Sequence, residues 1–250
     1  MRHVTLWRIL VMAAAIGALE VLCRVGVINA FTMQAPSRIA IDLWRMLLSG
    51  KHNAAIAKTL SNAGTALVLS IVVGILAAVV IHRLKLVREA LDPLFATYYA
   101  VPVLAFYPLL IILFGVGDAP KIVIAFLLGV IAVIVNTLNG LDRVPRVLLK
   151  TARIARMSAA ETAARVTLPY AAPYVLTGIK FAVAYSLIGI IGSEFIMSSD
   201  GMGFEIAFAY NNFDNATMYP LIVLILVISI GLNLLVSLWE QAILSRRGLR

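Results

Sequence analysis

Long apolar runs alternate with short polar segments along the whole chain. Each run has about 20 residues or more, which is the length that an α-helix needs to cross the hydrocarbon core of a bilayer. The first run is also longer than the hydrophobic part of a cleaved signal peptide. The pattern predicts an all-α membrane protein with about six transmembrane helices, at residues 9–28, 56–81, 94–114, 121–141, 174–196 and 219–238.

The first run contains two charged residues, Glu20 and Arg24, one helical turn apart. Charges at that depth are costly, so we expect the two side chains to pair, or Arg24 to reach the far membrane interface.

A short amphipathic helix is predicted after Pro36. Ile39, Leu43 and Met46 recur at helical spacing with charged residues between them. This helix is too short and too charged to span, so we expect it to lie in the membrane interface.

The third run is interrupted by Pro102 and Pro108. Prolines free backbone carbonyls, and broken spans are tolerated where neighbouring helices cover them or where they line a cavity. The run also carries Tyr98, Tyr99 and Phe106. These rings are candidates for part of a gate, while aromatic packing or an interfacial belt is the simpler explanation.

A basic, alanine-rich segment, residues 142–169, separates the fourth and fifth runs. It is too polar to cross a bilayer and too long for a simple turn. Pro145 suits the first turn of a helix, and good helix formers continue to Arg156. The alanines let another protein approach the backbone closely, so the segment is a candidate docking surface. The alternative is a surface loop that binds acidic lipid through its arginines.

A second short helix is predicted within the same segment. Ser158 and Glu161 have the spacing of a capping box, so this helix is expected to begin near Ala159. Pro169 disfavours the helical conformation of Leu168, so the helix is expected to stop before Pro169. The prediction is therefore two helices with a bend at residues 156–157.

Composition supports the membrane setting. Hydrophobic residues make up 62% of the chain and charged residues 13%, and the mean hydropathy is +0.99, which excludes an ordinary soluble domain. The net charge of +9 is not accompanied by a nucleic-acid-binding motif, so nucleic acid is not an expected partner. The basic residues are instead topology signals beside membrane lipid.

The distribution of Lys and Arg predicts the orientation, because cytoplasmic loops carry the excess. Four basic residues, Arg38, Arg45, Lys51 and Lys121, are assigned to the outer side. We therefore expect both termini and segment 142–169 to be cytoplasmic, together with Arg2, Arg8, Arg83, Lys85, Arg88, Arg143, Arg146, Lys150, Arg153, Arg156, Arg165, Arg246, Arg247 and Arg250.

No catalytic, metal or cofactor motif is present in the sequence. The three histidines are far apart, and the single cysteine, Cys23, allows no intrachain disulfide. Gly50-Lys51 is not a phosphate-binding loop, because Arg45 and His52 occupy positions that the motif assigns to Gly and Ser/Thr. The chain is expected not to be an enzyme and to have no ATP site or cofactor of its own.

Segment 142–169 resembles the EAA loop of ABC importer permeases. The family pattern is Glu-Ala-Ala, then Gly, then an Ile-x-Leu-Pro ending, at the spacing seen here. Lys150, Thr151 and Ala152 occupy the first three positions, Arg156 the glycine position, and residues 166–169 the ending. The first Glu and the Gly are replaced, and a left-handed bend costs a non-glycine residue roughly 1–2 kcal/mol. In the family this loop is a coupling helix that docks on a separate ATPase subunit.

The resemblance extends over most of the chain, to the permeases for nitrate, sulfonates and taurine. It implies the type I ABC importer permease fold, with a transmembrane and an interfacial helix in residues 1–52 and a permease core in residues 53–250. The residues that carry it are Leu91–Pro93, Pro102, Pro108, Phe114–Gly117, Lys121, Asn136, Thr137, Leu168, Pro169, Thr177–Lys180, Ser193–Phe195 and Gly201–Phe204.

The resemblance also implies partners and a localisation. We expect an inner-membrane subunit that pairs with a second copy of itself, with two ABC ATPase subunits that use the ATP, and with an external solute-binding protein. The solute is expected to be a small anion such as a sulfonate, taurine or nitrate; a pyrimidine or aromatic compound is the alternative. An ion-coupled secondary transporter is disfavoured because the sequence shows no internal repeat, and a purely structural subunit because the third run is broken.

Candidate site residues fall into two groups. The ATPase-coupling group is Lys150, Thr151, Ala152, Arg156, Met157, Ser158, Ala159, Ala160, Glu161, Arg165, Leu168 and Pro169. The translocation-pathway group is Tyr98, Tyr99, Pro102, Phe106, Asn136 and Glu194. For Asn136, a hydrogen bond between helices is the simpler explanation. For Glu194, the alternative is a hydrogen bond to Ser198 and Ser199 or to a neighbouring helix.

Overall fold

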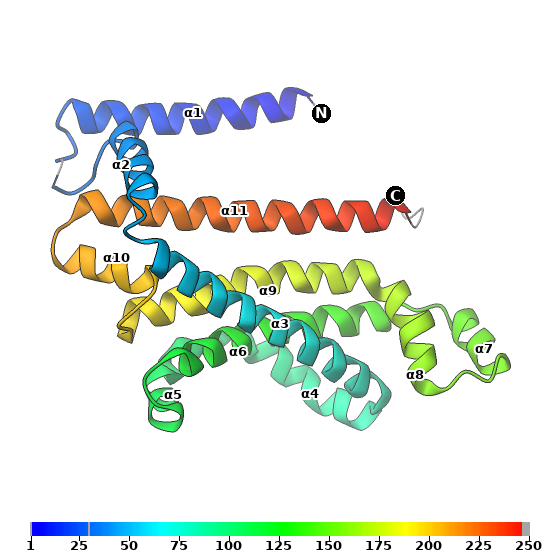
Figure 1. The fold of residues 1–250 in the computed structure, drawn as a ribbon. Coiled ribbons are helices and arrows are strands. Elements are labelled where there is room, and N and C mark those ends of the chain that lie inside the picture. Colours follow the sequence, from blue (N-terminus) through cyan, green and yellow to red (C-terminus); the bar gives the residue numbers. More distant parts are fainter. Residues whose placement is uncertain (1, 30, 247–250) are drawn as a thin grey trace.

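The computed structural model describes residues 2–29 and 31–246, and these residues form helices joined by short connections, with no strand among them (Figure 1). The elements are α1 (Arg2–Arg24), α2 (Pro36–Ser49), α3 (Asn53–Arg83), α4 (Lys85–Thr97), the 3-10 turns η1 (Tyr98–Ala100) and η2 (Val103–Phe106), α5 (Tyr107–Phe114), α6 (Asp118–Leu141), α7 (Arg146–Ile154), α8 (Ala159–Thr162), the π turn η3 (Ala163–Thr167), α9 (Leu168–Met197), α10 (Met202–Asn211) and α11 (Asn215–Arg246).

The predicted number of spans is confirmed. Five helices in the described residues are long and apolar enough to cross a membrane, and a bent pair of helices makes up to six. The bent pair is the proline-interrupted run: its halves, Lys85–Ala100 and Val103–Phe114, meet at 88°. The break lies at Val101 and Pro102, as the prolines predicted.

The core is built from α3, α6 and α9, which pack closely because small residues face one another. A Cβ added at Gly189 of α9 would lie 2.5 Å from the Cα of Ala125 in α6. A Cβ added at Gly129 of α6 would lie 2.8 Å from the hydroxyl oxygen of Ser70 in α3. Ala66, Ala125 and Ile190 are fully buried between these helices. The three helices thus form one tightly packed body around which the others are arranged.

Helix α1 lies apart from this core and contacts α2 (Figure 1). The predicted pair is present: Arg24 Nε lies 2.6 Å from a Glu20 carboxylate oxygen. Glu20 also accepts hydrogen bonds from the backbone N–H and hydroxyl of Ser37 in α2, at 2.9 and 2.7 Å. The helix ends at Arg24 and not at residue 28, because Gly26 adopts a left-handed turn conformation (φ 83°).

The predicted amphipathic helix is confirmed as α2, which starts at Pro36 and ends at Gly50 in the left-handed conformation. Its apolar residues Leu43 and Met46 pack against a cluster that includes Met202 and Leu221. Helix α2 therefore covers part of α10 and α11, and its other side exposes the apolar residues Ile41, Trp44 and Leu48 as well as Arg38 and Arg45.

Two local predictions were wrong. The connection between the apolar runs 174–196 and 219–238, which the pattern predicted only as a polar segment, contains helix α10. The helix that begins at Ala159 does not stop before Pro169, because residues 159–197 form one continuous helical span of 39 residues. The π turn η3 widens the helix just before Pro169, and this gives the ring room that a regular α-helical turn would deny it.

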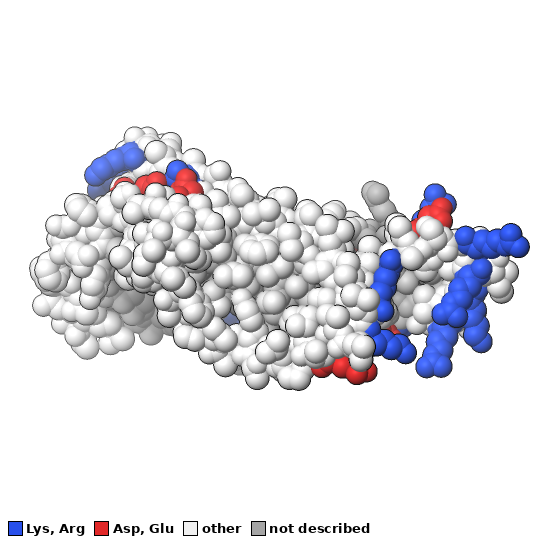
Figure 2. Space-filling view, turned by 90° about the horizontal axis from the view of Figure 1, so that it is seen from below, with Lys and Arg blue, Asp and Glu red and all other residues white. Residues whose placement is uncertain are grey.

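Both described ends of the chain lie at the same end of the molecule as α7 and α8 (Figure 1). Lys and Arg side chains gather at that end, and the middle of the face seen in Figure 2 shows almost none. Arg247 and Arg250, which were included in the prediction of orientation, lie outside the described residues.

Candidate functional site

Segment 142–169 forms two short helices joined by a sharp bend, as predicted. Helix α7 ends in a Schellman motif: the Met157 N–H donates to the Ala152 carbonyl, and the Arg156 N–H donates to the Arg153 carbonyl, both at 3.0 Å. This motif requires a left-handed residue at its fifth position, and Arg156 occupies that position with φ 52°. The bend is therefore made without the glycine of the family pattern.

Replacing Arg156 by glycine is expected to stabilise the bend by about 1 kcal/mol, because glycine adopts the left-handed conformation without steric cost. Hydrogen exchange of the Met157 amide, which is bonded across the bend, should then slow by roughly five- to tenfold. Arg153→Gly is the control: Arg153 is helical, so glycine there should weaken α7 by about 1 kcal/mol. Equal effects of both substitutions would contradict this account.

Helix α8 starts with the predicted capping box. The Glu161 N–H donates to the Ser158 hydroxyl at 3.2 Å, and the Ser158 N–H donates to the Glu161 carboxylate at 2.8 Å. Two of the N–H groups that a helix start leaves unpaired are thereby bonded, so the first turn of α8 is fixed by its own sequence.

The outer surface of this bent segment is a mixture of small, apolar and basic side chains. Val147 and Ile154 are 71% and 84% exposed, although both are apolar. Ala152 is the exception among the candidate coupling residues, because it is buried. Met157, Leu168 and Pro169 are half-buried, and the exposed candidates are Lys150, Thr151, Arg156, Ser158, Ala159, Ala160, Glu161 and Arg165.

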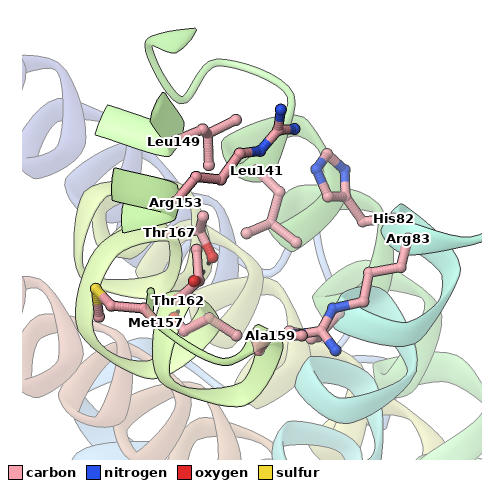
Figure 3. A pocket seen from close by; sticks show the side chains of 11 residues that line it. His82, Arg83, Leu141, Leu149, Arg153, Met157, Ala159, Thr162 and Thr167 are labelled. Carbon is pink, nitrogen blue, oxygen red and sulfur yellow. Dashed lines mark hydrogen bonds between the residues drawn. The ribbon is translucent and has the colours of Figure 1, made fainter. Parts of the chain in front are cut away.

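A cavity of about 380 Å³ lies between this segment and the core. Figure 3 shows His82 and Arg83 from α3 together with Leu149 and Arg153 from α7 around it. Arg83 donates a hydrogen bond to the Ala159 carbonyl, so the end of α3 holds the start of α8. Segment 142–169 is therefore attached to the core through Arg83, although the cavity separates much of the segment from the core.

The candidate pathway residues are only partly brought together. Tyr98 and Tyr99 lie at the break of the bent span, and Tyr99 stacks on Tyr185 of α9 with ring centroids 5.9 Å apart. Tyr185 in turn stacks on Phe181, at 6.5 Å. We name Tyr98, Tyr99, Tyr185 and Phe181 the aromatic row; Tyr99 is 52% exposed.

Phe181 and Tyr185 were not among the predicted site residues. They are four residues apart on one side of α9, a spacing that the sequence did contain. A second cavity, of about 330 Å³, adjoins the row through Tyr99 and is also lined by Phe95 and Asn139. Pro102 and Phe106 are exposed at the break. Asn136 is half-buried and donates to the Ala132 carbonyl of its own helix at 2.8 Å.

Glu194 lies away from the aromatic row, fully buried at the other end of the core. Its carboxylate accepts hydrogen bonds from the Thr59 hydroxyl, at 2.8 Å, and from the Gly203 N–H, at 3.0 Å. Of the alternatives weighed for this residue, the bond to a neighbouring helix is present, and Ser198 instead accepts from Asp200 N–H. The carboxylate thus sits at the N-terminus of α10, where a negative charge is favoured.

A cluster of four charged residues ties the same end of the core together. Lys121 of α6 is 1% exposed and lies 3.1 Å from Asp118 and 2.5 Å from Asp200. Lys58 of α3 lies 2.5 Å from Asp118. Burial raises the pKa of Asp200, but the hydrogen bond and charge of Lys121, together with the Ser198 hydrogen bond and the Lys58 charge, outweigh burial and hold the pKa below its ordinary value. The sequence indicated Lys121 only through the family resemblance and did not indicate its partners.

Within the described residues, no group of three or more His, Cys, Asp or Glu side chains is arranged to hold a metal ion.

Comparison with known proteins gives consistent results. Residues 70–248 match the family described as "Binding-protein-dependent transport system inner membrane component". The nitrate import permease protein NrtB of Leptolyngbya laminosa is 29% identical over 182 residues, a match that covers 73% of this chain and 65% of that protein's length. The putative aliphatic sulfonates transport permease protein SsuC of Bacillus subtilis (strain 168) is 26% identical over 240 residues, 96% of this chain and 87% of that protein.

The fold is also that of a solved structure. A chain of the MetNI methionine ABC transporter, solved in inward-facing conformations, superposes with a TM-score of 0.60 at 17% sequence identity. The match covers 84% of this chain and 99% of the other. At this identity, the likeness concerns the fold alone.

Proposed function

Because the chain belongs to the family of inner membrane components of binding-protein-dependent transport systems, we propose that it is the permease subunit of an ATP-driven importer. It is a multi-pass inner-membrane transport subunit and not an enzyme. A separate ABC ATPase hydrolyses the ATP, and an external solute-binding protein delivers the solute.

The bent segment α7–α8 is the proposed docking surface for the ATPase. This assignment rests on the exposed apolar and small side chains of the segment, above all Val147 and Ile154. Exposed apolar groups beside cations are typical of a surface that a protein partner covers. In this arrangement Lys150, Thr151, Ala159 and Ala160 face the partner, and the buried Ala152 does not.

The orientation follows from the same surface. Docking of an ATPase requires α7 and α8 to be cytoplasmic, and the basic side chains at that end agree with the excess expected there. Both termini then lie on the cytoplasmic side (Figure 1). The end that carries Glu194, Lys121 and α10 faces the solute-binding protein.

The translocation pathway is proposed to run along the aromatic row, between this chain and a second copy. Tyr99 and Phe181 are about half exposed at membrane depth. The hydroxyl of an exposed tyrosine such as Tyr99 finds a hydrogen-bond partner when a water-filled path or another protein adjoins it. ATP-driven closure of the two ATPases would draw the two docking surfaces together and open this path outward.

The solute is proposed to be a small anion of the nitrate or sulfonate type. Support comes from the names of the two relatives, which concern nitrate and aliphatic sulfonates. The aromatic row favours a second candidate, a pyrimidine or another aromatic compound, because stacked rings provide a planar, apolar surface.

The experiment that tests this function is copurification followed by transport. The tagged chain is expected to purify with an ABC ATPase and, in proteoliposomes with its binding protein, to take up one of nitrate, taurine or uracil only when ATP is inside. Tyr185→Ala should lower that uptake, whereas Trp7→Ala, at an exposed aromatic residue of α1, which lies apart from the core, should not. Purification without an ATPase, or ATP-independent uptake, would overturn the proposal.

A further inference from the structure

Asp142 joins three helices at the point where the core passes into segment 142–169, which is named the docking segment from here on. It follows directly on α6, and its carboxylate lies 3.1 Å from Nδ1 of His82 in α3. The second carboxylate oxygen lies 3.4 Å from Nη2 of Arg88 in α4. Arg88 is held in turn by Asp92, one turn further along α4, at 3.2 Å. A single side chain at the start of the loop is therefore bound to both α3 and α4.

Helix α4 is otherwise weakly attached. None of its residues is buried, although Leu91 and Phe95 pack partly against the core. In the described part of the chain, Arg88 is the one residue of α4 that forms an ion pair with another segment. Because α4 leads directly into η1, which carries Tyr98 and Tyr99, a displacement of α4 moves one side of the aromatic row.

The next residue is tied to a different helix. The Arg143 guanidinium lies over the Tyr174 ring of α9, 5.1 Å from its centroid. The junction between α6 and α7 thus has two attachments on neighbouring residues, one to α9 and one to α3 and α4. A movement of the docking segment is imposed on both at once.

On the basis of the importer function proposed above, we propose that Asp142 is a positioning residue that transmits movement of the docking segment to α4 and so to the break at Pro102. A partly exposed ion pair contributes little to global stability. It can still determine which of two positions α4 adopts, because coupling between sites requires only that one contact be kept while the rest of the structure moves.

The test uses spin labels and needs no knowledge of the solute. The complete complex of permease and ATPase is placed in nanodiscs, in a Cys23→Ser background that removes the single native thiol. Labels at Glu89→Cys report α4 and labels at Arg146→Cys report the docking segment, each as the distance between two permease copies. Distances are compared without nucleotide and after trapping with ATP and vanadate.

In the otherwise unchanged protein, both distances should shift on trapping. In Asp142→Asn, the shift at position 146 should remain and the shift at position 89 should be lost. Arg88→Gln, which breaks the same contact from α4, should give the same loss. Asp92→Asn is the matched control, because it removes a carboxylate from Arg88 but leaves the contact with Asp142, and both shifts should persist.

An undiminished shift at position 89 in Asp142→Asn and Arg88→Gln would overturn the role of Asp142 while leaving the importer function intact. Absence of a shift at both positions in the protein with neither change would overturn the importer function itself, and the role of Asp142 with it.

Discussion

Tryptophan at position 160 is expected to weaken association with the ATPase strongly while leaving the permease folded. Ala160 is the second residue of α8 and is exposed. A large side chain at this position therefore projects into solvent and does not clash with the permease itself. On a surface that a partner covers closely, the same side chain prevents contact. A loss of about 3 kcal/mol, typical of a central interface position, corresponds to a roughly 100-fold weaker association. The dissociation constant of the purified subunits measures this directly.

Ala242→Trp provides the control for that substitution. Ala242 is also exposed but lies near the end of α11, outside the docking segment. It should leave both association and ATP-dependent uptake unchanged. If Ala160→Trp binds the ATPase as tightly as the unchanged permease does, the docking surface lies elsewhere.

Valine at position 189 is expected to destabilise the whole helical core. The Cβ of any residue at this position would lie 2.5 Å from the Cα of Ala125, a backbone atom that a rotamer change cannot move. The two helices must separate, and this exposes the interface that holds α3, α6 and α9 together. Overpacking of this kind costs about 3 kcal/mol, which lowers the midpoint of thermal unfolding by roughly 6–12 °C in a chain of this size.

Gly64→Val is the matched control, because it places the same β-branched side chain in a helix. Nothing lies within 4 Å of a Cβ at Gly64. The unfolding midpoint of the purified protein in detergent should therefore change little for Gly64→Val and strongly for Gly189→Val. Similar midpoints for the two variants would show that α6 and α9 do not approach as closely as described.

The membrane architecture could be predicted because it depends on run length alone. The runs near residues 56–81 and 121–141 became α3 and α6 with ends shifted by at most three residues. Helix α10 could not be predicted, since its first turn is held by Thr59 and Glu194, which accept hydrogen bonds from the N–H groups of Met202 and Gly203 across the fold. Such distant partners leave no local sequence pattern.

The candidate site divides in the same way. The capping box at Ser158 and the bend at Arg156 use neighbours within five residues, so the sequence alone predicted them. The stacking of Tyr99 on Tyr185 and the contact of Asp142 with Arg88 join residues far apart in the chain. They depend on how α4, α6 and α9 are placed, which the order of apolar runs does not specify.

Helix α9 has a mechanical consequence. At 1.5 Å per residue, its 30 residues extend over roughly 45 Å. A tilt of about 5° around a fulcrum near its middle displaces each tip by roughly 2 Å, in opposite directions. Force applied at the tip that follows η3 thus arrives at the other tip reversed in sense, and the π turn beside the first tip is the place where such a lever would first yield.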